Sequence, residues 1–139
     1  MMIGIMSDTH DNLPLVEKAI ERLNKEKVEV TLHAGDYVAP FTIVRFKHLK
    51  AKLIGVFGNN DGDREMLKKR FAEIEGAEIR GDFAEVNISG LRIALLHGDG
   101  EMLQSLVNAQ FYDIVIHGHS HEARLFMKGR TTVVNPGEI

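Results

Sequence analysis

The chain has 139 residues, 44% hydrophobic and 27% charged, which is the composition of an ordinary soluble globular domain. Its net charge of −3 provides no general positive field, so we expect no dedicated DNA binding. Cysteine is absent, which excludes disulfides and thiolate metal sites, and no apolar run approaches the roughly 18 residues that a membrane span or a membrane anchor helix requires. The apolar run after Met1 is too short for a signal peptide, so we expect a cytoplasmic protein.

The first half of the chain repeats one pattern, in which a short apolar run is followed by a polar turn and an amphipathic stretch. The apolar runs predict strands, and the stretches with apolar residues at helical spacing predict helices. The expected strands cover residues 2–6, 28–32 and 53–57, and the expected helices cover residues 13–23, 40–49 and 64–74. Strands that alternate with helices are typical of a parallel sheet.

The second half of the chain is richer in strands. Residues 83–88 and 91–96 flank Ser89-Gly90, which predicts a hairpin. A helix near residues 101–109 is then followed by predicted strands at 113–117, 123–127 and 131–134. We expect a single α/β domain over residues 1–139, a sandwich of two sheets with helices on the outer faces.

Polar residues gather where the predicted strands end. They are Asp8 and His10, Asp36, Asn59 with Asp61, His97, and His119 with His121. Ligands of open α/β sheets bind beyond the carboxyl ends of the strands, so we expect these side chains to lie together. The sequence therefore predicts a site at this edge.

Carboxylate, imidazole and amide oxygen are ligands of divalent transition metals. In Asp8-Thr9-His10 and His119-Ser120-His121, the alternation of an extended chain would send both outer side chains to the same side. Taken alone, each residue has an ordinary explanation: Asp8 as a helix cap, or residues 59–62 as a plain turn. Seven donors in five strand-end clusters favour a metal site.

These residues, in this order, resemble the calcineurin-like metallophosphoesterases. The resemblance rests on Asp8-x-His10, Gly35-Asp36, Gly58-Asn59-x-Asp61, His97-Gly98 and Gly118-His119-x-His121, with Asn135-Pro136-Gly137 similar to a closing motif. It spans nearly the whole chain and implies a two-sheet fold of the metallophosphoesterase type. Relatives usually continue for a further pair of strands, so we expect this chain to lack them, and the exposed sheet edge would favour a homodimer.

The resemblance also implies roles for these residues. Asp8, His10 and His121 would hold one divalent ion, Asn59, His97 and His119 would hold a second, and Asp36 would bridge them. A hydroxide between the ions would attack phosphorus in a small phosphate ester or nucleotide-like substrate. Asp61 would accept a hydrogen bond from a ligand histidine, His10 or His97, or cap the helix that starts at Arg64.

The implied activity is that of a metal-dependent phosphoesterase, with a phosphodiesterase favoured. Mn²⁺ is the preferred expectation for both ions, with Ni²⁺, Fe²⁺, Co²⁺ or Zn²⁺ as alternatives. The alternatives for function are a phosphomonoesterase and a protein-binding module like Vps29, which would predict eroded metal ligands. Many family members carry a histidine where this chain has Asn60, and an amide cannot protonate a leaving group. We therefore predict better turnover of esters with acidic leaving groups.

Overall fold

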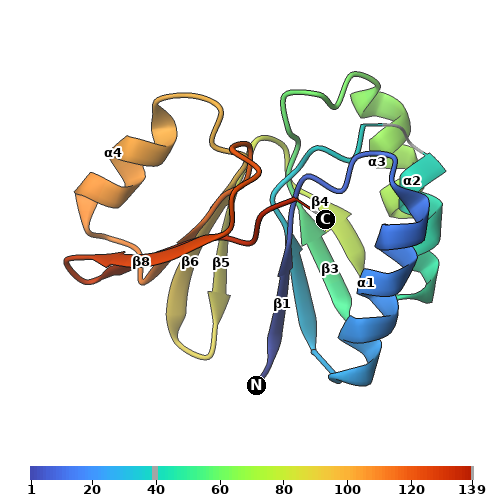
Figure 1. Ribbon diagram of the computed structural model, residues 1–139, viewed down its shortest axis with the longest axis horizontal. Helices are drawn as coiled ribbons and strands as arrows, with labels where there is room; N and C mark the ends of the chain where they lie inside the picture. Colours follow the sequence, from blue (N-terminus) through green and yellow to red (C-terminus); the bar gives the residue numbers. More distant parts are fainter. Residues whose placement is uncertain (39–40, 139) are drawn as a thin grey trace.

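The computed structural model describes residues 1–38 and 41–138, which fold into two β-sheets flanked by helices (Figure 1). The strands are β1 (Ile3–Met6), β2 (Val30–His33), β3 (Lys52–Gly55), β4 (Ala77–Ile79), β5 (Phe83–Ile88), β6 (Leu91–Leu96), β7 (Ile114–Ile116), β8 (Arg124–Lys128) and β9 (Thr131–Asn135). The helices are α1 (Leu13–Lys25), α2 (Phe41–Val44), α3 (Arg64–Ala72) and α4 (Met102–Ala109), with a 3-10 turn η1 over Arg45–His48. No helix in this described part of the chain is long and apolar enough to cross a lipid bilayer.

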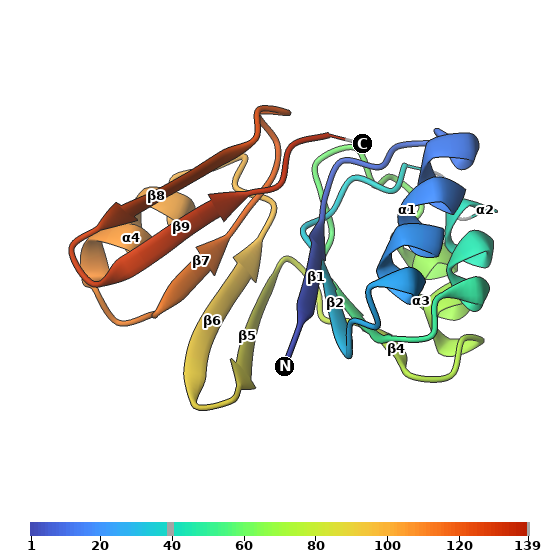
Figure 2. The same cartoon turned by 60° about the horizontal axis from the view of Figure 1, so that its bottom comes forward.

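The first sheet is parallel, with strand order β1-β2-β3-β4, and the second is mixed, with order β5-β6-β7-β9-β8. Helices α1, α2 and α3 lie on the outer side of the first sheet, and α4 lies on the outer side of the second (Figures 1 and 2). The predicted α/β sandwich with outer helices is confirmed.

Apolar side chains fill the three interfaces between these layers. Val16 and Ile20 of α1 are fully buried against the first sheet, as the 3.6-residue spacing of α1 requires. Leu32 and Ile93 belong to the aliphatic layer that is buried between the two sheets, and Val107 of α4 packs on the second sheet. Each such side chain contributes about 1.5–3 kcal/mol through burial.

Apart from small shifts in their ends, the predicted elements differ from the structure in two places. Strand β4 was not expected from the sequence. The helix predicted over residues 40–49 is a short α2 followed by η1, and its predicted start at Pro40 lies outside the described residues. The predicted hairpin is present, with Ser89 (φ 52) and Gly90 (φ 83) in the left-handed region at its turn.

The strand register brings the polar loops of both sheets to one edge. In the first sheet Met6 pairs with His33, which pairs with Gly55, so the loops after β1, β2 and β3 leave the sheet side by side. In the second sheet Leu95 pairs with Ile116, and the loops after β6 and β7 leave together. These loops carry all the predicted site residues.

Candidate metal centre

The loops after β1 and β2 are fastened to each other by main-chain hydrogen bonds. The Asp8 N–H donates to the Gly35 carbonyl at 2.9 Å, and the His10 N–H donates to the Asp36 carbonyl at 2.9 Å. Asp8 (φ 50) and His10 (φ 48) are left-handed, so the expected extended geometry at these two residues was wrong. Their side chains nevertheless converge, with His10 Nε2 3.9 Å from Asp8 Oδ1.

His119 (φ 71) and His121 (φ 64) repeat this conformation after β7. Asp36 (φ 64) shares it, so five of the seven predicted ligands have a backbone that non-glycine residues rarely adopt. Such backbone strain gathers at functional sites, where the surrounding structure holds it in place.

Asp8 and Asp36 lie at the centre of the cluster. The Asp8 Oδ1 atom lies 3.3 Å from His121 Nε2, 3.8 Å from His97 Nε2 and 3.9 Å from His10 Nε2. The Asp36 Oδ2 atom lies 3.4 Å from His97 Nε2 and 3.8 Å from His10 Nε2. One donor atom from each of Asp8, His10, Asp36 and His121 fits within 4.8 Å of the others, which is the spacing of a shared ion.

The remaining predicted donors adjoin this group. The His119 Nδ1 atom lies 3.2 Å from Asn59 Oδ1 and 3.3 Å from His97 Nε2. The structure thus brings all seven predicted donors together, from loops that follow β1, β2, β3, β6 and β7.

The residues present fit a metal ion. Asp8 Oδ1 and His10 Nε2 are buried atoms without a hydrogen-bond partner among the described residues. A buried polar atom left unpaired costs free energy, and buried polar groups are therefore almost always satisfied. A divalent cation would satisfy both atoms, and the oxygen and nitrogen donors suit a transition metal.

Two histidine rings are oriented by partners outside the cluster. The His97 Nδ1 atom lies 2.9 Å from the Ala34 carbonyl, to which it donates, so the Nε2 lone pair faces the cluster. The His121 Nδ1 atom lies 3.1 Å from Glu138 Oε2, which fixes His121 in the same tautomer. Glu138 was not predicted, because no local pattern links it to a histidine 17 positions earlier.

The Asp36 carboxylate is stabilised in its charged form. Burial alone would raise the pKa of Asp36, but the adjacent His97 ring and the hydrogen bonds donated by Asn60 hold this pKa well below its usual range. Burial lowers the pKa of His97, while its contacts with Asp36 and the Ala34 carbonyl outweigh this and raise it. Asn60 donates its main-chain N–H to Asp36 Oδ1 at 2.8 Å and its side-chain amide to Oδ2 at 2.9 Å, a role the sequence did not reveal.

Both roles predicted for Asp61 are wrong. Its carboxylate accepts the main-chain N–H groups of Asp36, Val38 and Gly58, and no bond to a histidine is present among the described residues. The cap of α3 is Asp63, whose side chain accepts the Met66 N–H. Burial raises the pKa of Asp61, although its three main-chain hydrogen bonds act in the opposite direction.

Glycine is required where two of these loops approach a carboxylate. A Cβ atom at Gly118 would overlap Ser7 Oγ and Asp8 Oδ2, and one at Gly58 would overlap Asp36 Oδ1. Both positions therefore need the absence of a side chain rather than conformational freedom.

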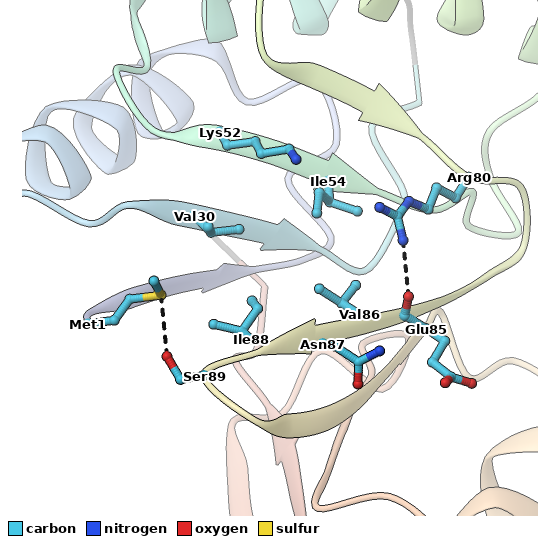
Figure 3. Close-up of a pocket in the computed structure, with 10 residues that line it drawn as sticks. All are labelled: Met1, Val30, Lys52, Ile54, Arg80, Glu85, Val86, Asn87, Ile88 and Ser89. Atoms are coloured by element: carbon cyan, nitrogen blue, oxygen red, sulfur yellow. Dashed lines mark hydrogen bonds between the residues drawn. The ribbon is translucent and has the colours of Figure 1, made fainter.

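A hollow of about 340 Å³ opens beside the cluster and shares Asn59 and His97 with it. Arg64 lines this hollow, paired with Asp82 at 2.8 Å and placed over the Phe57 ring at 4.6 Å. A larger hollow of about 480 Å³ lies at the opposite end of the strands, between the β5–β6 hairpin and the starts of β2 and β3 (Figure 3). Because none of the seven donors lines this larger hollow, only the smaller one adjoins the candidate centre.

Comparisons with known proteins point to one family. The model of the calcineurin-like phosphoesterase superfamily domain matches residues 1–139. The phosphodiesterase MJ0936 of Methanocaldococcus jannaschii is 44% identical over 139 residues, covering 99% of this chain and 84% of the relative. The phosphodiesterase YfcE of Escherichia coli is 23% identical over 152 residues, covering 100% of this chain and 79% of the relative.

Solved structures show the same fold. A structure of an archaeal phosphodiesterase superposes with a TM-score of 0.94 at 44% identity, covering 99% of this chain and 84% of that one. Vps29 of Cryptosporidium parvum superposes with a TM-score of 0.71 at 22% identity, covering 98% of this chain and 73% of that one. At that identity the second likeness concerns the fold alone.

Proposed function

This chain belongs to the calcineurin-like phosphoesterase superfamily, and we propose that it is a phosphodiesterase that works with two divalent ions at the strand-end cluster. It is a metal-dependent phosphoric ester hydrolase, and its substrates are small phosphate esters. The phosphodiesterases among its relatives support the preference for diesters.

One observation carries the two-ion proposal: oxygen and nitrogen donors from both sheets converge around buried atoms that lack partners. We assign Asp8, His10 and His121 to the first ion, Asn59, His97 and His119 to the second, and Asp36 to both. Ions held there would lower the pKa of a water molecule and neutralise phosphate oxygens. Mn²⁺ is our preferred metal for this set of donors.

The chain's own residues prepare the site for this chemistry. Asp36 is ionised at neutral pH because its pKa is held low, so it can bind cations without first losing a proton. The Ala34 carbonyl and Glu138 keep the ring nitrogens of His97 and His121 directed into the cluster. Arg64, in the adjoining hollow, is placed to contact a phosphate oxygen or an ester substituent of the substrate.

The proposal is tested by hydrolysis of an aryl phosphodiester and an aryl phosphomonoester after removal of metals with a chelator. Activity is expected to return on addition of Mn²⁺, with the diester preferred, and to be lost in Asp36→Asn. The matched control is Glu29→Gln, which removes the same charge from an exposed residue. Hydrolysis that persists in chelator and in Asp36→Asn would exclude the proposed chemistry, and a monoester preference would exclude the proposed substrate class.

We further propose that residues 1–139 form one domain and that β8 supports a homodimer. All five β8 residues are exposed at the edge of the second sheet, including Leu125 and Met127. An uncovered apolar edge strand favours association with another chain. Light scattering of the full chain measures the oligomeric state directly.

A further inference from the structure

The loop that presents Asp36 is held in a strained conformation. Asp36 (φ 64) and Val38 (φ 72) are both left-handed, and the β-branched side chain of valine makes that conformation especially costly. Strain of this kind persists only where neighbouring groups enforce it.

The group that restrains this loop is the carboxylate of Asp61, which is 4% exposed. Its Oδ2 atom accepts the Asp36 N–H at 3.0 Å and the Gly58 N–H at 2.7 Å. Its Oδ1 atom accepts the Val38 N–H at 2.7 Å. One buried carboxylate therefore joins the loop after β2, through the N–H groups of both strained residues, to the loop after β3.

Both joined loops carry proposed ion ligands. The Asp36 side chain projects from one, and Asn59 follows Gly58 in the other. Asp61 itself accepts hydrogen bonds from main-chain groups of these loops, and no hydrogen bond or ion pair with a histidine of the cluster is present in the described residues. Its effect on an ion would therefore act through the position of Asp36 and Asn59.

We propose that Asp61 is a positioning residue that sets the ion affinity of the centre by locking the strained Asp36 loop onto the Gly58–Asn59 loop. This inference rests on the ion site proposed above. Hydrogen-bonding partners that orient metal ligands typically change metal affinity by about 10–100-fold when they are removed.

The variant that tests this is Asp61→Asn, which keeps the shape of the side chain. The asparagine NH₂ group cannot accept a hydrogen bond, so at least one of the three main-chain N–H groups would face a donor. The structural control is Asp63→Ala in the same segment, which removes the α3 cap and lowers the urea midpoint of unfolding. It removes the same charge, but the Asp63 side chain accepts from the Met66 N–H of α3 and not from Asp36, Val38 or Gly58.

The measurement is a titration of the chelator-treated full chain with Co²⁺, followed by its visible absorption spectrum, alongside urea unfolding. We expect Asp61→Asn to weaken Co²⁺ binding by about tenfold or more. We expect Asp63→Ala to bind as the wild type does, despite its lower stability. Wild-type affinity in Asp61→Asn, or an equal loss in Asp63→Ala, would overturn the inference.

A second variant keeps the test decisive if Asp61→Asn folds poorly. Glycine adopts the φ of Val38 without strain, so Val38→Gly combined with Asp61→Asn is expected to recover several-fold of the lost Co²⁺ affinity. A double variant that binds no better than Asp61→Asn would show that Asp61 does not act by restraining this loop. Should the wild type bind no Co²⁺, the proposed function fails; if it binds while Asp61→Asn is unchanged, this inference alone fails.

Discussion

Asn60 lies against the proposed bridging carboxylate but cannot protonate a leaving group. We predict that the wild type cleaves aryl diesters far better than alkyl diesters, since general acid help is typically worth ~10²–10⁴-fold. Asn60→His should raise the alkyl-to-aryl ratio of kcat/KM by about tenfold or more, measured with one substrate of each kind.

The ratio is the informative quantity because Asn60 also donates to both oxygens of Asp36. Loss of the side-chain bond lowers turnover of both substrates alike, and Asn60→Ala measures that loss without adding an acid. An unchanged alkyl-to-aryl ratio of kcat/KM in Asn60→His would contradict the prediction that the wild type lacks a general acid at this position.

Arg64 is the cation that adjoins the candidate centre through the smaller hollow. We predict that Arg64→Ala raises the KM for an aryl phosphodiester by roughly five- to tenfold, since it removes one charge-assisted contact, and changes kcat less. Arg70→Ala serves as the control because Arg70 pairs with Glu73 on the exposed face of α3. Equal KM values for Arg64→Ala and Arg70→Ala would show that Arg64 does not bind the substrate.

The sequence predicted the seven donors because they gather in short polar clusters just after the predicted strands. It could not identify the partners of Asp61, which are main-chain groups that any residue could supply. It also missed Glu138, whose contact with His121 depends on how the last residues return to the cluster.

The loops at the ends of the strands depend on close main-chain approach, most of all after β7. A methyl group at Gly118 would overlap Ser7 and Asp8, so Gly118→Ala should displace Asp8 and reduce kcat/KM by about 100-fold or more. Gly62→Ala is the matched control, because a Cβ atom there meets nothing within 4 Å. Aryl diester hydrolysis by both variants checks this, and comparable losses would contradict it.

Most elements were predictable from their apolar runs or helical spacing, and strand β4 and the α2–η1 stretch were not. Residues 83–88 and 91–96, on either side of the Ser89-Gly90 turn, were predicted as strands with the bounds that β5 and β6 have. Strand β4 has three half-buried residues, too few to display alternation. The stretch after Pro40 was predicted as one helix, but it changes from α2 to η1, because its periodicity does not distinguish the two helix types.

The whole molecule should lose stability as the pH falls, in part because of His33. Burial, reinforced by nearby His97, lowers the pKa of His33 to about 3 from 6.5. Between these values the unfolded chain binds a proton that the folded chain does not, so the free energy of unfolding falls with decreasing pH. The slope from this group is about 1.4 kcal/mol per pH unit.

Urea unfolding of chelator-treated protein at pH 4.5, 5.5 and 7.5 measures this slope. His33→Asn should flatten it, because the titrating group is removed, whereas His48→Asn at an exposed position should leave it unchanged. An identical slope in wild type and His33→Asn would contradict the assignment.

The two-sheet architecture was predictable because strands that alternate with helices and strands that form hairpins occupy separate halves of the chain. The way the sheets meet was not, since it depends on the aliphatic layer between them rather than on any local pattern.

Ligands reach the cluster from both sheets, with Asp8 and Asp36 on one side and His97 and His121 on the other. Ions bound there would link the two sheets, so the bonds that serve catalysis would also stabilise the fold. At a hundredfold excess over Kd a single ion adds about 2.7 kcal/mol to stability. We expect calorimetry to show that the Tm rises when Mn²⁺ is added and falls when chelator is added. A Tm that neither addition changes would mean that bound ions do not stabilise the packing of the two sheets.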